Sequence, residues 1–272
     1  MIRHIALPFV LSAFWGTVAF GQAVGLVDLP QSAPADIVIL GETHDNPTHH
    51  LSQAELVARW KPAALVFEML TPDQAAQSIG VSRQDAPAMA KALAWEASGW
   101  PDYAMYHPIF AASGTARIYG AALDRADVRR SMTEGAAAVF GADAGLFGLT
   151  KPLDRTEQSA READQLAAHC DALPLAMLPQ MVAAQRLRDA AFARTSLQAL
   201  KETGGPVVVI TGSGHADIAR GIPAALREAA PDVTVFSLGQ IEGDPGQDAP
   251  FDAWIITEPT PRDDPCAGFT KP

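Results

Sequence analysis

Two Gly-x-x-His motifs, each close behind a short run of β-branched residues, constrain the fold of this chain more than any other feature. Residues 37–40 (Ile-Val-Ile-Leu) lead into Gly-Glu-Thr-His at 41–44, and residues 207–210 (Val-Val-Val-Ile) lead, after one threonine, into Gly-Ser-Gly-His at 212–215. A short apolar run that ends near a glycine is typical of a buried parallel strand opening into a loop. Because ligands of open α/β sheets bind outside the carboxyl ends of such strands, we expect both motifs at one rim of one sheet.

Two carboxylates join the two histidines at this predicted rim. Glu42 and His44 are two residues apart, so an extended backbone places both side chains on one face. His215 comes from the second motif, and Glu68 follows a third strand-like run at 64–67. Either motif alone is more often structural, since a strand-end Glu frequently caps a helix or pairs with an Arg. Their combination after two buried strands predicts a functional site.

This set of side chains suits a divalent metal ion. Two imidazoles and two carboxylates match the ligands that Zn, Mn or Fe takes in proteins. A bound ion acidifies a water molecule, which then hydrolyses an amide or ester, and Glu42 or Glu68 is the predicted ligand or general base. The neighbouring Asp45 is interpreted as a turn or cap residue, and His49 and His50 as surface residues in the first turn of a helix.

The composition excludes one large class of function. The chain has 272 residues, of which 48% are hydrophobic and 19% charged, which suits one large or two small globular domains. The formal net charge is −11, from 20 basic and 31 acidic residues. Since no cluster of Lys and Arg provides a surface for phosphates, we do not expect nucleic-acid binding.

Residues 1–21 have the pattern of a cleaved signal peptide. A weakly basic start precedes an apolar run at 5–18, and Ala19 and Gly21 are the small residues expected before a cleavage site. The run is short and contains Pro8, so we expect no stable membrane insertion, with a retained N-terminal anchor helix as the alternative. No Cys follows it for lipid attachment, and we therefore expect a mature periplasmic protein.

The chain has two cysteines, Cys170 and Cys266. An even number of cysteines in an exported protein favours a disulfide, which here joins the tail to a helix well before it. Two independent free thiols are the alternative. The absence of a C-x-x-C motif leaves thioredoxin-like redox chemistry and structural zinc without support.

Strand-like runs alternate with longer helical segments, which predicts an α/β fold with a mainly parallel central sheet flanked by helices. The predicted strands are 36–41, 63–68, 116–120, 207–211, 233–238 and 252–257. The predicted helices are 47–60, 71–115, 155–200 (split by two prolines) and a short helix after 221, with 123–150 expected to be loosely structured. The helical segments 71–110 and 155–200 are too long for simple crossovers, so we expect a helical insertion over the C-terminal rim of the sheet. The α/β domain is predicted at 35–258, followed by a Pro-rich tail at 259–272.

Four ordered segments of the sequence resemble the ChaN family. They are residues 41–46 (Gly-Glu-Thr-His-Asp-Asn) with the following 49–53 and 67–70, the aromatic segment 95–108, residues 184–190 (Ala-Gln-Arg-Leu-Arg-Asp-Ala), and residues 210–215 (Ile-Thr-Gly-Ser-Gly-His). ChaN proteins are described as iron-regulated, haem-binding lipoproteins with an α/β core and a helical subdomain, in a superfamily with the Tiki metalloproteases. The resemblance covers about 35–240, but this chain lacks the lipid-attachment Cys of some members.

The resemblance implies two different functions. The first is haem binding in haem or iron uptake, which needs an apolar slot with axial groups such as Tyr or His. The residues expected to line this slot, for each of which ordinary core packing is the alternative, are Trp100, Tyr103, Tyr106 and His107. The second is metal-dependent hydrolysis, as by a Tiki-like peptidase or esterase, with Glu42, His44, Glu68 and His215 as the site.

Three polar residues on the long Ala-rich helix are further candidates. Gln185 and Asp189 share a helix face because they are four residues apart, and Arg186 follows Gln185. We expect them to contact the residues of the site without contacting its ligand, or to contact a haem propionate. A helix-to-sheet hydrogen bond is the alternative. A haem held between two protomers would make a homodimer ligand-dependent.

Overall fold

The computed structural model describes residues 21–244 and 249–268, so the predicted signal peptide lies outside the described residues apart from Gly21. The described residues form a seven-stranded sheet in the order β1-β7-β6-β2-β5-β3-β4, in which each neighbouring pair is parallel. The strands are β1 (Gln22–Ala23), β2 (Ile37–Glu42), β3 (Ala64–Phe67), β4 (Arg117–Gly120), β5 (Val207–Gly212), β6 (Val235–Glu242) and β7 (Ala253–Thr257). The predicted α/β architecture with a mainly parallel sheet is confirmed.

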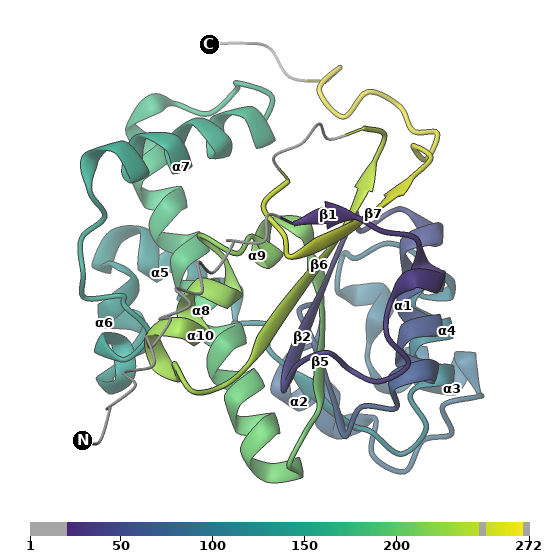
Figure 1. The fold of residues 1–272 in the computed structure, drawn as a ribbon. Coiled ribbons are helices and arrows are strands. Elements are labelled where there is room, and N and C mark those ends of the chain that lie inside the picture. Colours follow the sequence, from purple (N-terminus) through teal and green to yellow (C-terminus); the bar gives the residue numbers. More distant parts are fainter. Residues whose placement is uncertain (1–20, 245–248, 269–272) are drawn as a thin grey trace, which may run out of the picture.

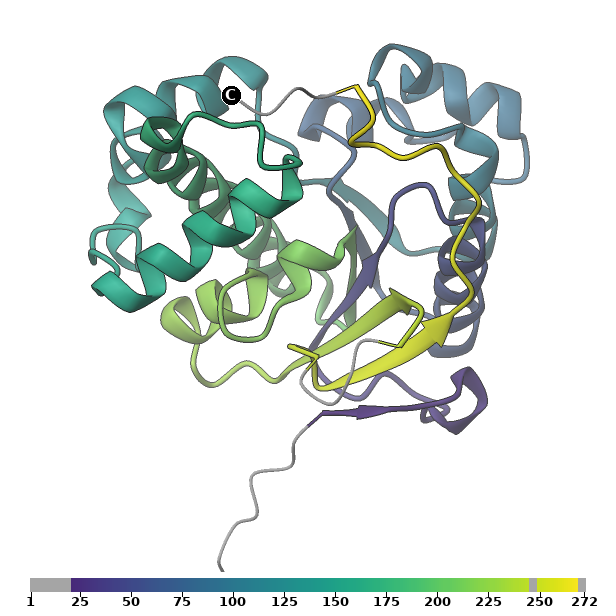
Figure 2. The same cartoon turned by 90° about the horizontal axis from the view of Figure 1, so that it is seen from above.

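Helices cover both faces of the sheet (Figures 1 and 2). The first face carries α1 (Pro47–Trp60), α2 (Pro72–Gln77), α3 (Ala86–Ala92) and α4 (Tyr103–Ala112), with the short 3-10 turns η1 (Leu26–Asp28) and η2 (Trp95–Ala97). The second carries α5 (Arg125–Glu134), α6 (Ala136–Phe140), α7 (Arg155–Ala168), α8 (Leu178–Thr203), α9 (Ser213–Ala216) and α10 (Ile222–Ala229), with η3 (Ala142–Gly145) and η4 (Leu175–Met177). In the part of the chain that the structure describes, no helix is long and apolar enough to cross a membrane.

The two central strands are buried on both faces, which explains their unbroken apolar sequences. Side chains alternate along a strand, so Val38 and Leu40 pack with the α1 and α4 side, while Ile37 and Ile39 pack with the α8 and α10 side. All six residues of β2, and all six of β5, are buried. The two hydrophobic clusters on either side of the sheet hold the strand ends, and hence the rim, in fixed register.

Several helix boundaries follow from local sequence, but one predicted segment is wrong. Helix α1 spans the predicted residues, because the Asn46 side chain accepts a hydrogen bond from the Thr48 backbone and Pro47 suits the first turn. Residues 123–150 are not loose: they contain α5, α6 and η3. Gly135 and Gly141 separate these elements with φ of 87° and 92°, a conformation that glycine readily adopts. Helices α5, α6 and α7 pack on α8, and the predicted helical segment 71–115 is divided into α2, α3, η2 and α4.

A disulfide and a group of ion pairs tie the tail after β7 to the rest of the molecule. Cys170, just after α7, and Cys266 form a disulfide with a Cα–Cα distance of 5.4 Å, so the alternative of two free thiols is wrong. Arg262 binds Glu242 and Asp45, with distances of 2.6 Å and 2.8 Å for the shortest contacts. Asp45 is therefore part of an ion pair that ties the tail to the loop carrying His44.

Candidate functional site

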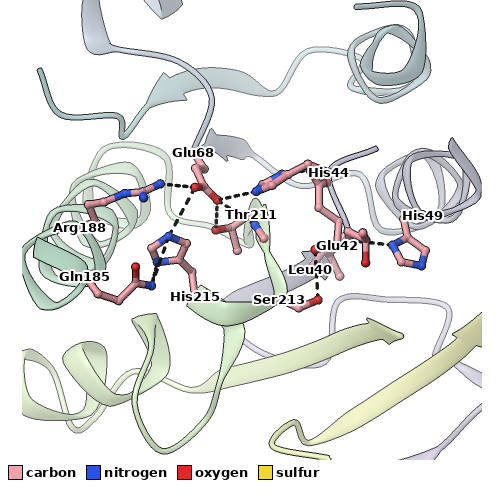
Figure 3. Close-up of polar contacts among 12 residues, drawn as sticks. Leu40, Glu42, His44, His49, Glu68, Gln185, Arg188, Thr211, Ser213 and His215 are labelled. Carbon is pink, nitrogen blue, oxygen red and sulfur yellow. Dashed lines mark hydrogen bonds and ion pairs between the residues drawn. The ribbon is translucent and has the colours of Figure 1, made fainter. Parts of the chain in front are cut away.

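Glu68 lies at the centre of a polar cluster at the carboxyl ends of three neighbouring strands, β3, β5 and β2. Its Oε2 accepts hydrogen bonds from the Thr211 hydroxyl (2.7 Å) and the Gly212 backbone N–H (2.8 Å). Its Oε1 accepts one from the Arg188 guanidinium at 2.5 Å. Figure 3 shows the carboxylate between Arg188 and His44, with His215 beside it. Burial acts to raise the pKa of Glu68, but His215 and Arg188 outweigh it and hold that pKa well below its usual range.

His44 is oriented by Glu42 and lies against an aromatic ring. Its Nδ1 is 2.8 Å from Glu42 Oε1, and its Nε2 is 3.9 Å from Glu68 Oε2. The ring centroid lies 4.8 Å from that of Trp100. A Cβ at position 212 would approach His44 Nε2 to 2.7 Å, so the glycine of the second motif makes room for the histidine of the first. The His44 side chain is 32% exposed, which leaves part of the imidazole open to solvent.

His215 closes the other side of the cluster. Its Nδ1 is 2.6 Å from Asp189 Oδ1 and 3.0 Å from Gln185 Nε2, both on α8, and its Nε2 is 3.4 Å from Glu68 Oε1. Burial acts to lower the pKa of His215, but Glu68 and Asp189 outweigh it and raise the pKa to about 9. The geometry therefore favours an imidazolium held between two carboxylates.

Glu42 belongs to a second, fully buried network behind the first. The Tyr106 hydroxyl donates to its Oε1 at 2.7 Å, and His50 Nδ1 lies 3.4 Å from its Oε2. Burial acts to raise the pKa of Glu42, but His44 and His50 outweigh it and lower the pKa to about 2. The lowered pKa favours the anionic form of Glu42, whose Oε1 fixes His44 through its Nδ1.

The interpretation of His49 and His50 as surface residues is wrong, since both are fully buried. His49 Nδ1 accepts from the Thr43 backbone N–H at 2.8 Å, and its Nε2 donates to the Thr257 hydroxyl at 2.8 Å. His50 Nε2 donates to the His44 carbonyl at 2.9 Å. The first turn of α1 is enclosed because it lies between the His44 loop and the end of β7. Burial lowers the pKa of His49 to about 4.

The predicted metal ligands meet at the rim, but not as a metal-binding group. Among the described residues, no set of three or more His, Cys, Asp or Glu side chains is placed to hold a metal ion. The physical reason is Arg188, which binds one oxygen of Glu68, while Thr211 and Gly212 bind the other. The hypothesis of a metal-dependent hydrolase therefore gains no support from this geometry.

The four residues expected to line a haem slot separate in the structure. Trp100 is half-buried and lines a cavity at the rim. Tyr106 is fully buried on Glu42, and Tyr103 is buried with no protein partner for its hydroxyl among the described residues. His107 is half-buried, and its Nε2 donates to the Arg83 carbonyl at 3.1 Å. A haem contact by Tyr103, Tyr106 or His107 stays a prediction.

Of the three candidates on α8, two contact the polar cluster and one does not. Gln185 and Asp189 contact His215, whereas Arg186 donates to the carbonyls of residues 148 and 151, at 2.7 Å and 2.9 Å. Arg188 was not among the predicted residues. Its spacing of three from Gln185 places it on the same helix face, and this periodicity is the signal that identifies it.

A cavity of about 580 Å³ opens beside the polar cluster. Its lining includes Glu68, Arg188 and Trp100, and also residues from the start of α5. Its apolar wall consists of Met69, Leu123, Val128 and Phe192. This volume falls within the range of small-molecule and cofactor sites, roughly 300–1,000 Å³.

Comparison with known proteins identifies the family. A protein-family model described as haem-binding uptake, Tiki superfamily, ChaN, matches residues 29–226, which is most of the chain and includes every residue of the polar cluster. The chain belongs to this family. No curated protein matches the sequence. The resemblance to ChaN proteins inferred from the four motifs is confirmed.

Solved structures show the same fold for a ChaN protein. One, described as cofacial haem binding to ChaN of Campylobacter jejuni, has a TM-score of 0.60 and 18% sequence identity, and the match covers 80% of this chain and 86% of the other. The type III effector HopBA1 matches with a TM-score of 0.45 and 12% identity over 83% and 88% of the two chains. A Bacillus cereus protein matches with a TM-score of 0.36 and 15% identity over 80% and 69%. The last two scores are too low to support an argument.

Proposed function

We propose that this ChaN-family chain binds haem in the cavity beside the polar cluster. The observation that carries the proposal is the composition of that cavity, which combines an apolar wall, a half-buried tryptophan and three arginines, and the partly exposed His44 contacts this tryptophan. A haem also combines apolar and charged parts, since its flat apolar ring carries two carboxylates and an iron that binds imidazole. The family description and the haem protein with the same fold support the proposal.

The residues present fit a haem in two further respects. Trp100 gives an aromatic surface for the ring, and it also contacts His44. Of His44, His49, His50 and His215, His44 has the most exposed side chain, and Glu42 holds its Nδ1. A metal-ligating histidine usually donates its second N–H to a carboxylate, so the Glu42–His44 pair suits this role. His44 Nε2 is the atom that we assign to the iron.

We propose that the protein is exported and that it uses this binding in haem or iron uptake. The support is the N-terminal signal-peptide pattern and the membership in a family described as haem-binding uptake proteins. The disulfide between Cys170 and Cys266 agrees with an oxidising compartment such as the periplasm.

A haem-dependent homodimer is a second part of the proposal. Its support is the cofacial haem binding described for the Campylobacter jejuni protein. We expect the mass of the mature chain in solution, measured by light scattering during gel filtration, to double on adding haemin. A mass that stays at one chain with haemin bound would contradict this part alone.

A haemin titration of three proteins tests the assignment of His44. We expect a saturable Soret shift with the wild type, and binding at least about tenfold weaker after His44→Ala, because one iron–ligand bond is lost. His169→Ala is the matched control, since His169 lies at the end of α7 and bonds the Gln165 carbonyl. Equal binding by all three proteins would show that His44 is not the ligand.

A further inference from the structure

Two arginines on α5 line the cavity beside the polar cluster. Arg125, Val128 and Arg129 line it together because positions three and four apart share a helix face. Val128 belongs to the apolar wall of the cavity, so Arg125 and Arg129 lie beside apolar surface. This arrangement suits a ligand that is apolar in one part and anionic in another.

Neither arginine has a carboxylate partner, whereas seven of the fourteen arginines among the described residues form an ion pair with Asp or Glu. Within the described residues, Arg129 has no hydrogen bond or ion pair, and Arg125 donates only to the Ser98 carbonyl at 3.1 Å. Arg130, the next residue on the helix, differs sharply because it pairs with both Asp127 and Glu134, at 3.0 Å and 2.9 Å. Unpaired cations in a chain with a net charge of −11 stand out as candidate partners for an anion.

The charged side chains that line the cavity sum to an excess of one positive charge. Three guanidinium groups line it, and Arg188 is already bound to Glu68. One further carboxylate, Asp124, lines the cavity, and its side chain does not cap α5. The positive charge therefore exceeds the negative charge, and the excess lies at the α5 side.

We infer that Arg125 and Arg129 bind the carboxylate groups of the ligand, which for haem are its two propionates. This inference rests on the proposed function, since it places the ring against Trp100 and the apolar wall. Arg125 lies beside Gly99, the residue before Trp100, because a Cβ at Gly99 would be 3.5 Å from its NH2 group. A planar guanidinium binds a carboxylate through two parallel N–H groups, which makes arginine better suited than lysine to this task. The two arginines thus orient the ring with its carboxylates toward α5.

Haemin and its dimethyl ester, in which both propionates are esterified, give a direct test. We measure the dissociation constant of each by quenching of tryptophan fluorescence. Arg129→Gln should weaken haemin binding about 5- to 10-fold, the loss of one charge-assisted contact at an exposed site. The ester should bind the wild type more weakly than haemin does, and Arg129→Gln should change its affinity less than twofold. Arg130→Gln, the matched control, should leave both affinities unchanged.

The outcomes separate the inference from the proposed function. An equal loss for haemin and the ester in Arg129→Gln would overturn the inference, since the arginine would then act on the ring or the fold. Tight haemin binding that is unchanged in an Arg125→Gln/Arg129→Gln double variant would overturn it while the proposed function stands. A wild type that binds neither compound would overturn both. Urea unfolding of each variant confirms that the compared proteins are folded.

Discussion

The buried hydroxyl of Tyr106 offers a sharp test of the network that orients His44. Tyr106→Phe removes one oxygen and with it the 2.7 Å hydrogen bond to Glu42. Glu42 is 2% exposed and its pKa is lowered to about 2, so the carboxylate stays charged and buried with one donor fewer. A hydrogen bond to a charged group contributes about 1.5–3 kcal/mol. We therefore expect the free energy of unfolding to fall by about 2 kcal/mol.

Tyr103→Phe is the matched control on the same helix. Tyr103 is also buried, but its hydroxyl has no protein partner in the described part of the chain. Removing an unsatisfied hydroxyl relieves a desolvation cost, so we expect a change within about 0.5 kcal/mol or a gain in stability. Urea unfolding followed by circular dichroism measures both values. At about 2–4 °C per kcal/mol, the Tyr106 variant should also melt about 4–8 °C lower.

The comparison of the two variants decides whether the reasoning holds. Equal losses would mean that packing of the α4 aromatics, and not the bond to Glu42, explains the effect. No loss in Tyr106→Phe would mean that His44 and His50 alone satisfy the buried carboxylate. Either result would refute the account of how the rim histidine is held.

Three further predictions follow from burial, chain closure and charge. Burial lowers the pKa of His49 to about 4, whereas the value in the unfolded chain is about 6.5. Between these pH values the unfolded state binds more protons, so the free energy of unfolding falls as the pH falls. From pH 7 to pH 4 the wild type should lose up to about 3 kcal/mol more than His49→Gln does. Cys266→Ser opens a loop that spans 96 residues and should cost about 3–5 kcal/mol in urea unfolding, with reduced wild type falling to the same value. Glu68→Gln leaves Arg188 without its carboxylate and should cost about 3–5 kcal/mol; a loss below 1 kcal/mol would contradict the pairing.

Much of the sheet and the meeting of the rim residues could be predicted from the sequence. The runs before Gly41 and Gly212 are buried β-branched strands, and parallel strands bring their carboxyl ends to one edge. This is why Glu42, Glu68 and His215 converge although they are far apart in the chain. The signal is local for each strand, and the geometry of a parallel sheet supplies the rest.

The features that sequence reasoning missed depend on contacts between distant segments. The face of α8 that meets the end of β3 is decided by packing, so the pairing of Arg188 with Glu68 has no local signal beyond helical spacing. The burial of His49 requires β7 to lie over the first turn of α1, as its bond to Thr257 shows. A polar residue in a first turn is normally exposed, and here tertiary structure overrides that tendency.

A crystal structure of the mature chain grown with haemin tests the central claim most directly. The account predicts one haem per chain in the cavity beside Glu68, with the ring against Trp100, the iron on His44 and the propionates toward Arg129. A haem bound on another face of the molecule, or density for no haem at a saturating concentration, would contradict it.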